Sequence, residues 1–177
     1  WDFIAMSPEL LVHCQEADAI WFGTLGQRSE VSRSTTRQLL ASTPPHTLRI
    51  FDLNLRQHYF SRDLIHESLL FADIVKLNDE ELSLLPEMLG ISGANTRDQL
   101  SEIHDRYRLK AIACTRGSAG SLIYDGTDWS DHPGLETEVA DTIGAGDSFT
   151  AALTVGWLKG WPKIGRASCR ERVYHPV

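Results

Sequence analysis

The 177-residue chain has few of the features that mark secreted, metal-binding or membrane proteins. Its three cysteines, Cys14, Cys114 and Cys169, show no C-x-x-C spacing, which argues against a disulfide framework and against a zinc site. The apolar runs are too short to span a bilayer, and the first residues lack the basic start of a signal peptide. We therefore expect a cytoplasmic protein with no membrane partner.

Positive charge is also scarce. The chain carries 17 Lys and Arg residues against 24 Asp and Glu residues, a formal net charge of −7. It has no basic stripe with interleaved aromatic residues, so we expect no nucleic-acid partner. The seven histidines show no metal-ligand spacing. The hydrophobic content of 42% is sufficient for the core of one globular domain.

Short apolar runs alternate with segments of helical pattern, which predicts an α/β three-layer sandwich with a mostly parallel sheet. The predicted strands are Ala19–Phe22, Leu48–Asp52, Ile74–Leu77 and Ala111–Cys114. The predicted helices are Glu30–Ala41, Arg62–Ala72, Asp79–Leu89 and Thr96–Tyr107. After these elements, the pattern predicts a hairpin of Ser121–Tyr124 and Gly126–Trp129 that turns at Asp125-Gly126.

The most informative segment is Asp141-Thr-Ile-Gly-Ala-Gly-Asp-Ser-Phe149, which precedes a predicted buried helix, Phe149–Leu158. A flexible turn at residues 144–146 would let backbone N–H groups approach an anion beside the positive end of the helix. Phosphate is the natural ligand for such a site. Asp147 is then either a base that takes a proton from an attacking hydroxyl or a simple helix cap.

Polar residues also follow the predicted strands, where ligands collect in open α/β sheets. In Asp52-Leu-Asn-Leu-Arg56, an extended backbone would put Asp52, Asn54 and Arg56 on one side, to face a ligand or to pair Asp52 with Arg56. Asn78 and Glu81 have the spacing of a capping box, which accounts for both residues without any ligand.

Glycines follow two further strands. The glycines of Thr115-Arg-Gly-Ser-Ala-Gly120 suit either close passage over a ligand or the entry to the hairpin. Gly23 and Thr24 follow the first strand, where they would line an acceptor pocket.

These four ordered motifs, D-x-N-x-R, N-x-x-E, T-x-G-x-x-G and D-T-x-G-A-G-D-x-F, resemble those of the PfkB carbohydrate kinases, the ribokinase-like sugar kinases, over roughly residues 16–160. Rossmann and P-loop fingerprints do not fit, because Phe149 replaces the third glycine and no G-K-[ST] follows. The resemblance implies a ribokinase-like fold, ATP, Mg²⁺ and K⁺ as cofactors, and a small sugar as substrate. It allows a homodimer of a longer parent protein.

The resemblance also implies a role for each motif residue. Asp147 would be the catalytic base, with the backbone of Gly144, Ala145 and Gly146 as the anion hole. Asp141 would lie near a monovalent cation, and Glu81 would hold Mg²⁺ through water. Nucleotide contacts would come from Asn78, Thr115, Gly117 and Gly120, and acceptor contacts from Asn54, Arg56 and Gly23.

The function we expect is transfer of the γ-phosphoryl group of ATP to a sugar hydroxyl, with fructokinase-like specificity. A ketodeoxy sugar acid, whose carboxylate Arg56 would meet, or a nucleoside is the alternative acceptor. A non-catalytic nucleotide-binding remnant is the alternative class.

Both ends of the chain indicate a partial domain. Residues 1–160 match the C-terminal portion of the family domain, without its N-terminal part and β lid, so we expect little or no kinase activity from the chain alone. The basic segment after Trp161 is interpreted as a non-native or frame-shifted tail, 161–177, with a solvated terminal helix as the alternative.

Overall fold

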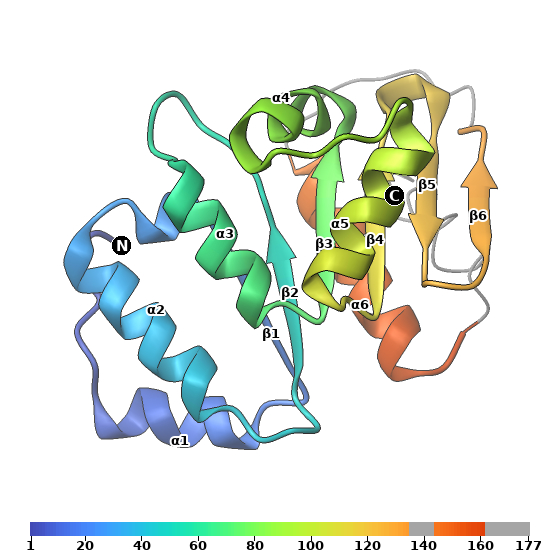
Figure 1. Cartoon of the computed structure of the whole chain (residues 1–177). Helices are drawn as coiled ribbons and strands as arrows, with labels where there is room; N and C mark the ends of the chain where they lie inside the picture. The colour runs from blue at the N-terminus through green and yellow to red at the C-terminus, as the bar shows by residue number, and fades with distance from the viewer. Residues whose placement is uncertain (135–143, 162–177) are drawn as a thin grey trace.

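A single β-sheet organises the fold of the computed structural model, which describes residues 1–134 and 144–161. The strands lie in chain order across the sheet (Figure 1). They are β1 (Ala19–Gly23), β2 (Leu48–Asp52), β3 (Ile74–Asn78), β4 (Ala111–Thr115), β5 (Ser121–Tyr124) and β6 (Trp129–His132). Strands β1 to β4 pair in parallel, as the sequence predicts. Strand β5 pairs antiparallel with β4, and β6 pairs antiparallel with β5 in the predicted hairpin.

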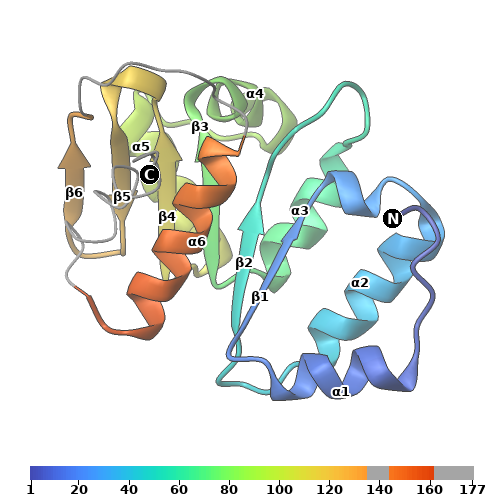
Figure 2. The ribbon, with the colours of Figure 1, turned by 180° about the vertical axis from the view of Figure 1, so that it is seen from behind.

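Helices cover both faces of the sheet, which confirms the predicted three-layer α/β sandwich. One face carries α2 (Glu30–Ser42), α3 (Arg62–Phe71), α4 (Asp79–Leu89) and α5 (Thr96–Tyr107), and α6 (Ala145–Leu158) crosses the other (Figures 1 and 2). Helix α1 (Pro8–Glu16) packs beside α2. Short 3₁₀ turns lie at Leu25–Gln27 and Gly117–Ala119. In the described part of the chain, no helix has the length and apolar character needed to cross a membrane.

Side-chain caps explain why the predicted starts of α2 to α5 are accurate. Ser29, Ser61 and Asn95 each accept a hydrogen bond from the backbone N–H three residues later, at the starts of α2, α3 and α5. Asn78 caps α4 in the same way. Gly90 ends α4 in the left-handed conformation, with φ 64°.

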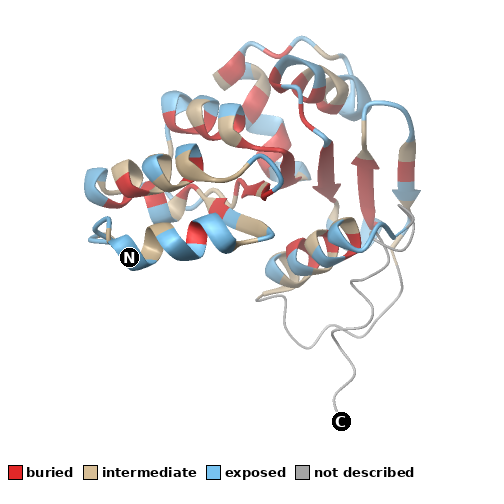
Figure 3. Ribbon diagram, turned by 90° about the horizontal axis from the view of Figure 1, so that it is seen from below, coloured by how far each residue is buried: buried red, intermediate tan, exposed pale blue. Residues whose placement is uncertain are grey.

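Alternate residues of the central strands enter two separate cores. Phe51 and Val75 pack under the α2–α5 layer, whereas Ile50 and Ile74 pack with Phe149 under α6. Figure 3 shows the buried strands between helices whose outer surfaces are exposed. Burial on both faces explains why these strands appear in the sequence as continuous apolar runs.

Two predicted elements are misplaced by more than one residue, and one helix is missed. The last strand, β6, is Trp129–His132 rather than Gly126–Trp129, because Asp125 Oδ1 accepts hydrogen bonds from the backbone N–H groups of Thr127 and Asp128 and holds these residues in the turn. Helix α6 begins at Ala145, four positions before the predicted start. Helix α1, which Ser7 caps, is absent from the sequence prediction.

Candidate active site

The predicted site residues that the structure describes come together at one edge of the sheet. The parallel strands β1 to β4 all end there, so their polar carboxyl ends are neighbours. Gly23 lies opposite Asp52 in the β1–β2 register, and Asn78 lies opposite Thr115 in the β3–β4 register. The start of α6 reaches the same edge from the other face of the sheet (Figure 2). Four motifs that are distant in sequence therefore surround one location.

The Gly-Ala-Gly segment is the start of a helix rather than the predicted flexible turn. Only Gly144 lies outside α6, as its N-cap, with φ 77° in the left-handed region that favours glycine. Ala145 and Gly146 are already in the first turn. The first N–H groups of a helix have no acceptor within the helix, so this end has the donors that an anion needs.

Asp147 lies in the first turn of α6 with its side chain exposed. Gly144, not Asp147, is the N-cap of the helix. The Asp147 carboxylate makes no hydrogen bond or ion pair with any residue of 1–134 and 144–161, so it is available to a ligand. A carboxylate in this position is also favoured by the positive end of the helix dipole.

The backbone after β2 does not stay extended, so the predicted alignment of Asp52, Asn54 and Arg56 on one side is wrong. Asn54 has φ 41°, in the left-handed region. The alternative prediction, an ion pair between Asp52 and Arg56, is also wrong, because Asp52 pairs with Lys76 instead. Arg56 is exposed and has no ion-pair partner among the described residues.

Hydrogen bonds from three neighbouring elements hold this loop, which we call the acceptor loop (residues 53–56). The hydroxyl of Thr24 donates to the Leu53 carbonyl at 2.8 Å, and the Leu53 N–H donates to the Lys76 carbonyl at 3.0 Å. The N–H of Leu55 donates to Glu81 Oε1 at 2.9 Å. Thr24 is fully buried, so it supports the loop and does not line a pocket as predicted.

Gly23 has a packing role. An alanine Cβ there would lie 2.9 Å from the carbonyl oxygen of Asp52, so only glycine permits this close approach of β1 to β2.

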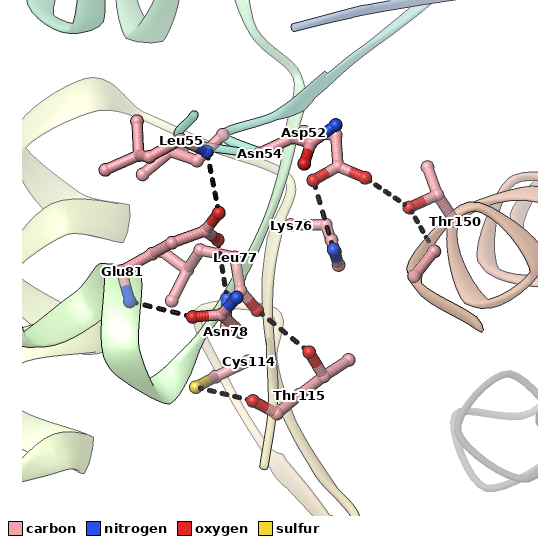
Figure 4. A network of polar contacts seen from close by, with 12 residues as sticks. Asp52, Asn54, Leu55, Lys76, Leu77, Asn78, Glu81, Cys114, Thr115 and Thr150 are labelled. Atoms are coloured by element: carbon pink, nitrogen blue, oxygen red, sulfur yellow. Dashed lines mark hydrogen bonds and ion pairs between the residues drawn. The ribbon is translucent and has the colours of Figure 1, made fainter. Parts of the chain in front are cut away.

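The predicted capping box of Asn78 and Glu81 is present. The Glu81 N–H donates to Asn78 Oδ1 at 2.7 Å, and the Asn78 N–H donates to Glu81 Oε2 at 2.8 Å. Because Oε1 of Glu81 also receives the Leu55 N–H, one buried carboxylate joins α4 to the acceptor loop (Figure 4). Each oxygen thus accepts one backbone N–H and keeps a second lone pair for a water molecule.

The loop after β4 passes the same edge. Thr115 is buried, with its hydroxyl 3.5 Å from the Leu77 carbonyl oxygen. Gly117 is exposed with φ 54°, whereas Gly120 is buried with φ 87°. Arg116 pairs with Asp131 at 2.6 Å. Of this loop, Gly117 is the predicted nucleotide contact that a ligand could reach most easily.

A buried polar network, which the sequence analysis missed, joins both faces of the sheet at this edge (Figure 4). Lys76 Nζ donates to Asp52 Oδ1 at 3.1 Å, and the Thr150 hydroxyl donates to Asp52 Oδ2 at 2.9 Å. Burial raises the pKa of Asp52, and the attraction of Lys76 only partly opposes this. A lysine inside the buried run Ile74-Val-Lys-Leu was the available sequence signal, because lysine is rarely buried without a partner.

Within the described ranges, no group of three or more His, Cys, Asp or Glu side chains could hold a metal ion. Mg²⁺ in proteins usually keeps several water ligands and binds substrate phosphates. A lone pair on each Glu81 carboxylate oxygen could accept a hydrogen bond from one of these waters. Asp141, predicted to lie near a monovalent cation, is outside the described residues, as is the predicted tail after Trp161.

Comparison with known proteins identifies the family. The model of the pfkB family of carbohydrate kinases matches residues 5–167, and the chain belongs to this family. The 2-dehydro-3-deoxygalactonokinase of Haloferax volcanii is 30% identical over 166 residues, covering 89% of this chain and 51% of that protein. The fructokinase of Klebsiella pneumoniae is 30% identical over 135 residues, covering 72% of this chain and 42% of that protein.

Solved structures are similar to this chain as well. An uncharacterized sugar kinase from Pyrococcus horikoshii, solved in complex with ATP, superposes with a TM-score of 0.67 at 30% identity, covering 82% of this chain and 45% of that chain. The chain therefore spans about half the length of the relatives that it matches. The family resemblance read from the four motifs is confirmed, and the relatives are kinases that act on sugars.

Proposed function

We propose that the protein transfers the γ-phosphoryl group of ATP to a sugar hydroxyl, with Asp147 as the catalytic base. One observation carries the proposal: an exposed carboxylate without a partner in the described part of the chain lies in the first turn of α6, at the sheet edge that also bears the acceptor loop. The ATP complex of the Pyrococcus horikoshii sugar kinase, a structural relative, supports ATP as the phosphoryl donor.

In this mechanism each residue has a separate task. Asp147 takes the proton from the sugar hydroxyl as its oxygen attacks the γ-phosphorus. The backbone N–H groups of residues 144–146 bind the negative charge that develops on the phosphoryl oxygens. Asn54 and Arg56 orient the acceptor. Asn78, Thr115, Gly117 and Gly120 contact the nucleotide, and Gly23 permits the close approach of strands beside the acceptor.

Two cations complete the proposed site. Mg²⁺, when bound, neutralises charge on the ATP phosphates, and Glu81 would hold it through a water molecule. Asp141 would lie near K⁺. Glu81 keeps its two backbone hydrogen bonds in this arrangement and therefore maintains the acceptor loop at the same time.

Fructose is the first candidate acceptor, and a ketodeoxy sugar acid is the second. The second candidate is supported by Arg56, an exposed cation on the acceptor loop with no ion-pair partner among residues 1–134 and 144–161, which suits a substrate carboxylate. It is also supported by the similarity to the Haloferax volcanii kinase. A nucleoside is a third candidate of the same reaction class.

A coupled ADP-release assay tests the proposal. We would assay this chain, and a form extended to the length of its relatives, against fructose, a 2-keto-3-deoxy sugar acid and cytidine. The proposal predicts acceptor-dependent ADP release by the extended form. Arg56→Lys and Arg56→Gln separate the candidates, because loss of a carboxylate contact raises the KM for the sugar acid more than the KM for fructose. Absence of release with every acceptor, while the protein is folded and binds ATP, would refute the kinase function.

A further inference from the structure

The buried network at the site contains a threonine on α6 that no motif assigns. Thr150 is 2% exposed and lies one helical turn after Gly146, and Asp52 is 1% exposed. Their hydrogen bond of 2.9 Å joins residues 98 positions apart, so it links the helix that carries Asp147 to the strand that leads into the acceptor loop.

Lys76 completes the network from β3. Its Nζ donates to the other oxygen of Asp52 at 3.1 Å, and the lysine is 6% exposed. An alanine Cβ at Gly146 would lie 3.0 Å from this Nζ, so the ammonium group lies directly against the first turn of α6. Asp52 therefore holds Lys76 and Thr150 with separate oxygens, and both partners contact α6 or belong to it.

The Thr150 hydroxyl has a second acceptor nearby. It lies 3.1 Å from the Gly146 carbonyl oxygen as well as 2.9 Å from the Asp52 carboxylate. One hydroxyl donates only one proton, and a hydrogen bond to a carboxylate is stronger than one to a neutral carbonyl. The proton is therefore directed to Asp52, and the helix is attached to the sheet through this bond.

Asp52 also fixes the acceptor side through its backbone. The next residue, Leu53, is held at both its N–H and its carbonyl, by Lys76 and by Thr24. Asn54 then adopts its left-handed conformation. One residue thus carries the acceptor loop through the main chain and the start of α6 through the side chain.

We propose that Thr150 is a positioning residue that, through Asp52 and Lys76, sets the distance between the base on α6 and the acceptor loop. This inference rests on the proposed function. Because Thr150 and Asp52 are buried, they do not meet substrate, and their effect is on geometry rather than on ground-state binding. Misplacement of reacting groups by about 1 Å costs on the order of 100-fold in rate.

Thr150→Val tests this role, because valine keeps the shape of threonine and removes the hydroxyl. Thr150→Ser restores the hydroxyl. The matched control is Thr154→Val, one turn later on α6, whose hydroxyl donates at 2.7 Å to the carbonyl of Thr150 within the helix. Hydrogen exchange of residues 144–151 is measured in the 177-residue chain itself, so this readout needs no catalysis.

We expect Thr150→Val to speed this exchange on the order of tenfold, and Thr150→Ser and Thr154→Val to stay within about twofold of the parent. In the form that transfers phosphoryl groups, Thr150→Val should lower kcat about 10- to 100-fold with little change in KM, and Thr150→Ser should recover it. Equal exchange and equal kcat for the two valine variants would overturn the inference. If the parent transfers no phosphoryl group, the proposed function fails, and the exchange alone decides whether Thr150 fixes the start of α6.

Discussion

Gly120→Ala tests how tightly the loop after β4 packs against the end of β6. Gly120 has φ 87° and ψ −137°, a region almost restricted to glycine, where another residue costs about 1–3 kcal/mol. An alanine Cβ would also lie 1.9 Å from the carbonyl oxygen of His132 and 2.3 Å from the Gly134 nitrogen. Both are backbone atoms, one at the end of β6 and one just after it, so no side-chain rotation relieves the overlap.

The overlap adds about 1–3 kcal/mol, as overpacking typically does. The total expected loss in the free energy of unfolding is therefore about 2–6 kcal/mol. Gly117→Ala is the matched control in the same loop, because its φ is 54° but no atom lies within 4 Å of the added Cβ. Only the left-handed backbone opposes that change, at about 1–2 kcal/mol.

Urea denaturation of both variants measures this difference, and thermal midpoints check it, since each 1 kcal/mol shifts the midpoint by about 2–4 °C for a chain of this size. We expect Gly120→Ala to be clearly the less stable of the two. If Gly120→Ala were no less stable than Gly117→Ala, the packing argument would be refuted.

Two further predictions concern a carboxylate and a thiol of the fold. Burial alone would raise the pKa of Asp73, but hydrogen bonds from Arg49 and Lys110 outweigh it and lower the pKa, so its stabilisation is present at neutral pH and lost as pH falls below about 4. Asp73→Asn should lower the free energy of unfolding by about 2 kcal/mol at pH 7 in urea denaturation, and this loss should shrink in acid. The control Asp131→Asn, at a more exposed carboxylate, should lower it by under about 1 kcal/mol. Equal losses for the two variants at all pH values would contradict this. Burial raises the pKa of Cys114 to about 12, so iodoacetamide at pH 8 should leave this cysteine unlabelled until the chain unfolds, as peptide mass spectrometry would show; labelling at the unfolded rate would contradict the burial.

Local signals in the sequence predict most of the fold. Helices α4 and α5 were predicted with the observed bounds, because Asn78 and Asn95 provide caps and the apolar spacing is regular. The second strand of the hairpin was misplaced because the side chain of Asp125 organises a longer turn than the Asp-Gly pair suggests. The start of α6 was misplaced because glycines have low helix propensity, although Gly146 lies in the first turn of the helix.

The sequence predicts which motifs form the site, but not which side chains contact one another within it. The four motifs do meet at one edge of the sheet, as the rule for open α/β sheets requires. The partner of Asp52 was not predictable, because it depends on the β2–β3 register and on the position of α6 across the sheet. The alternation of side chains along an extended strand favoured Arg56 as the partner of Asp52. The left-handed conformation of Asn54, which no local sequence pattern indicates, breaks this alternation before Arg56.

The role of Asp147 is the central claim, and the rate of phosphoryl transfer by Asp147→Asn tests it most directly. Because Asp147 is exposed and has no partner among the described residues, the substitution should change the free energy of unfolding by under about 1 kcal/mol, mainly through the helix dipole. ³¹P NMR of ATP and the acceptor sugar, with the form that turns over, would follow formation of the sugar phosphate. The account predicts a rate at least about 100-fold lower for Asp147→Asn at unchanged stability; transfer at the parent rate would contradict it.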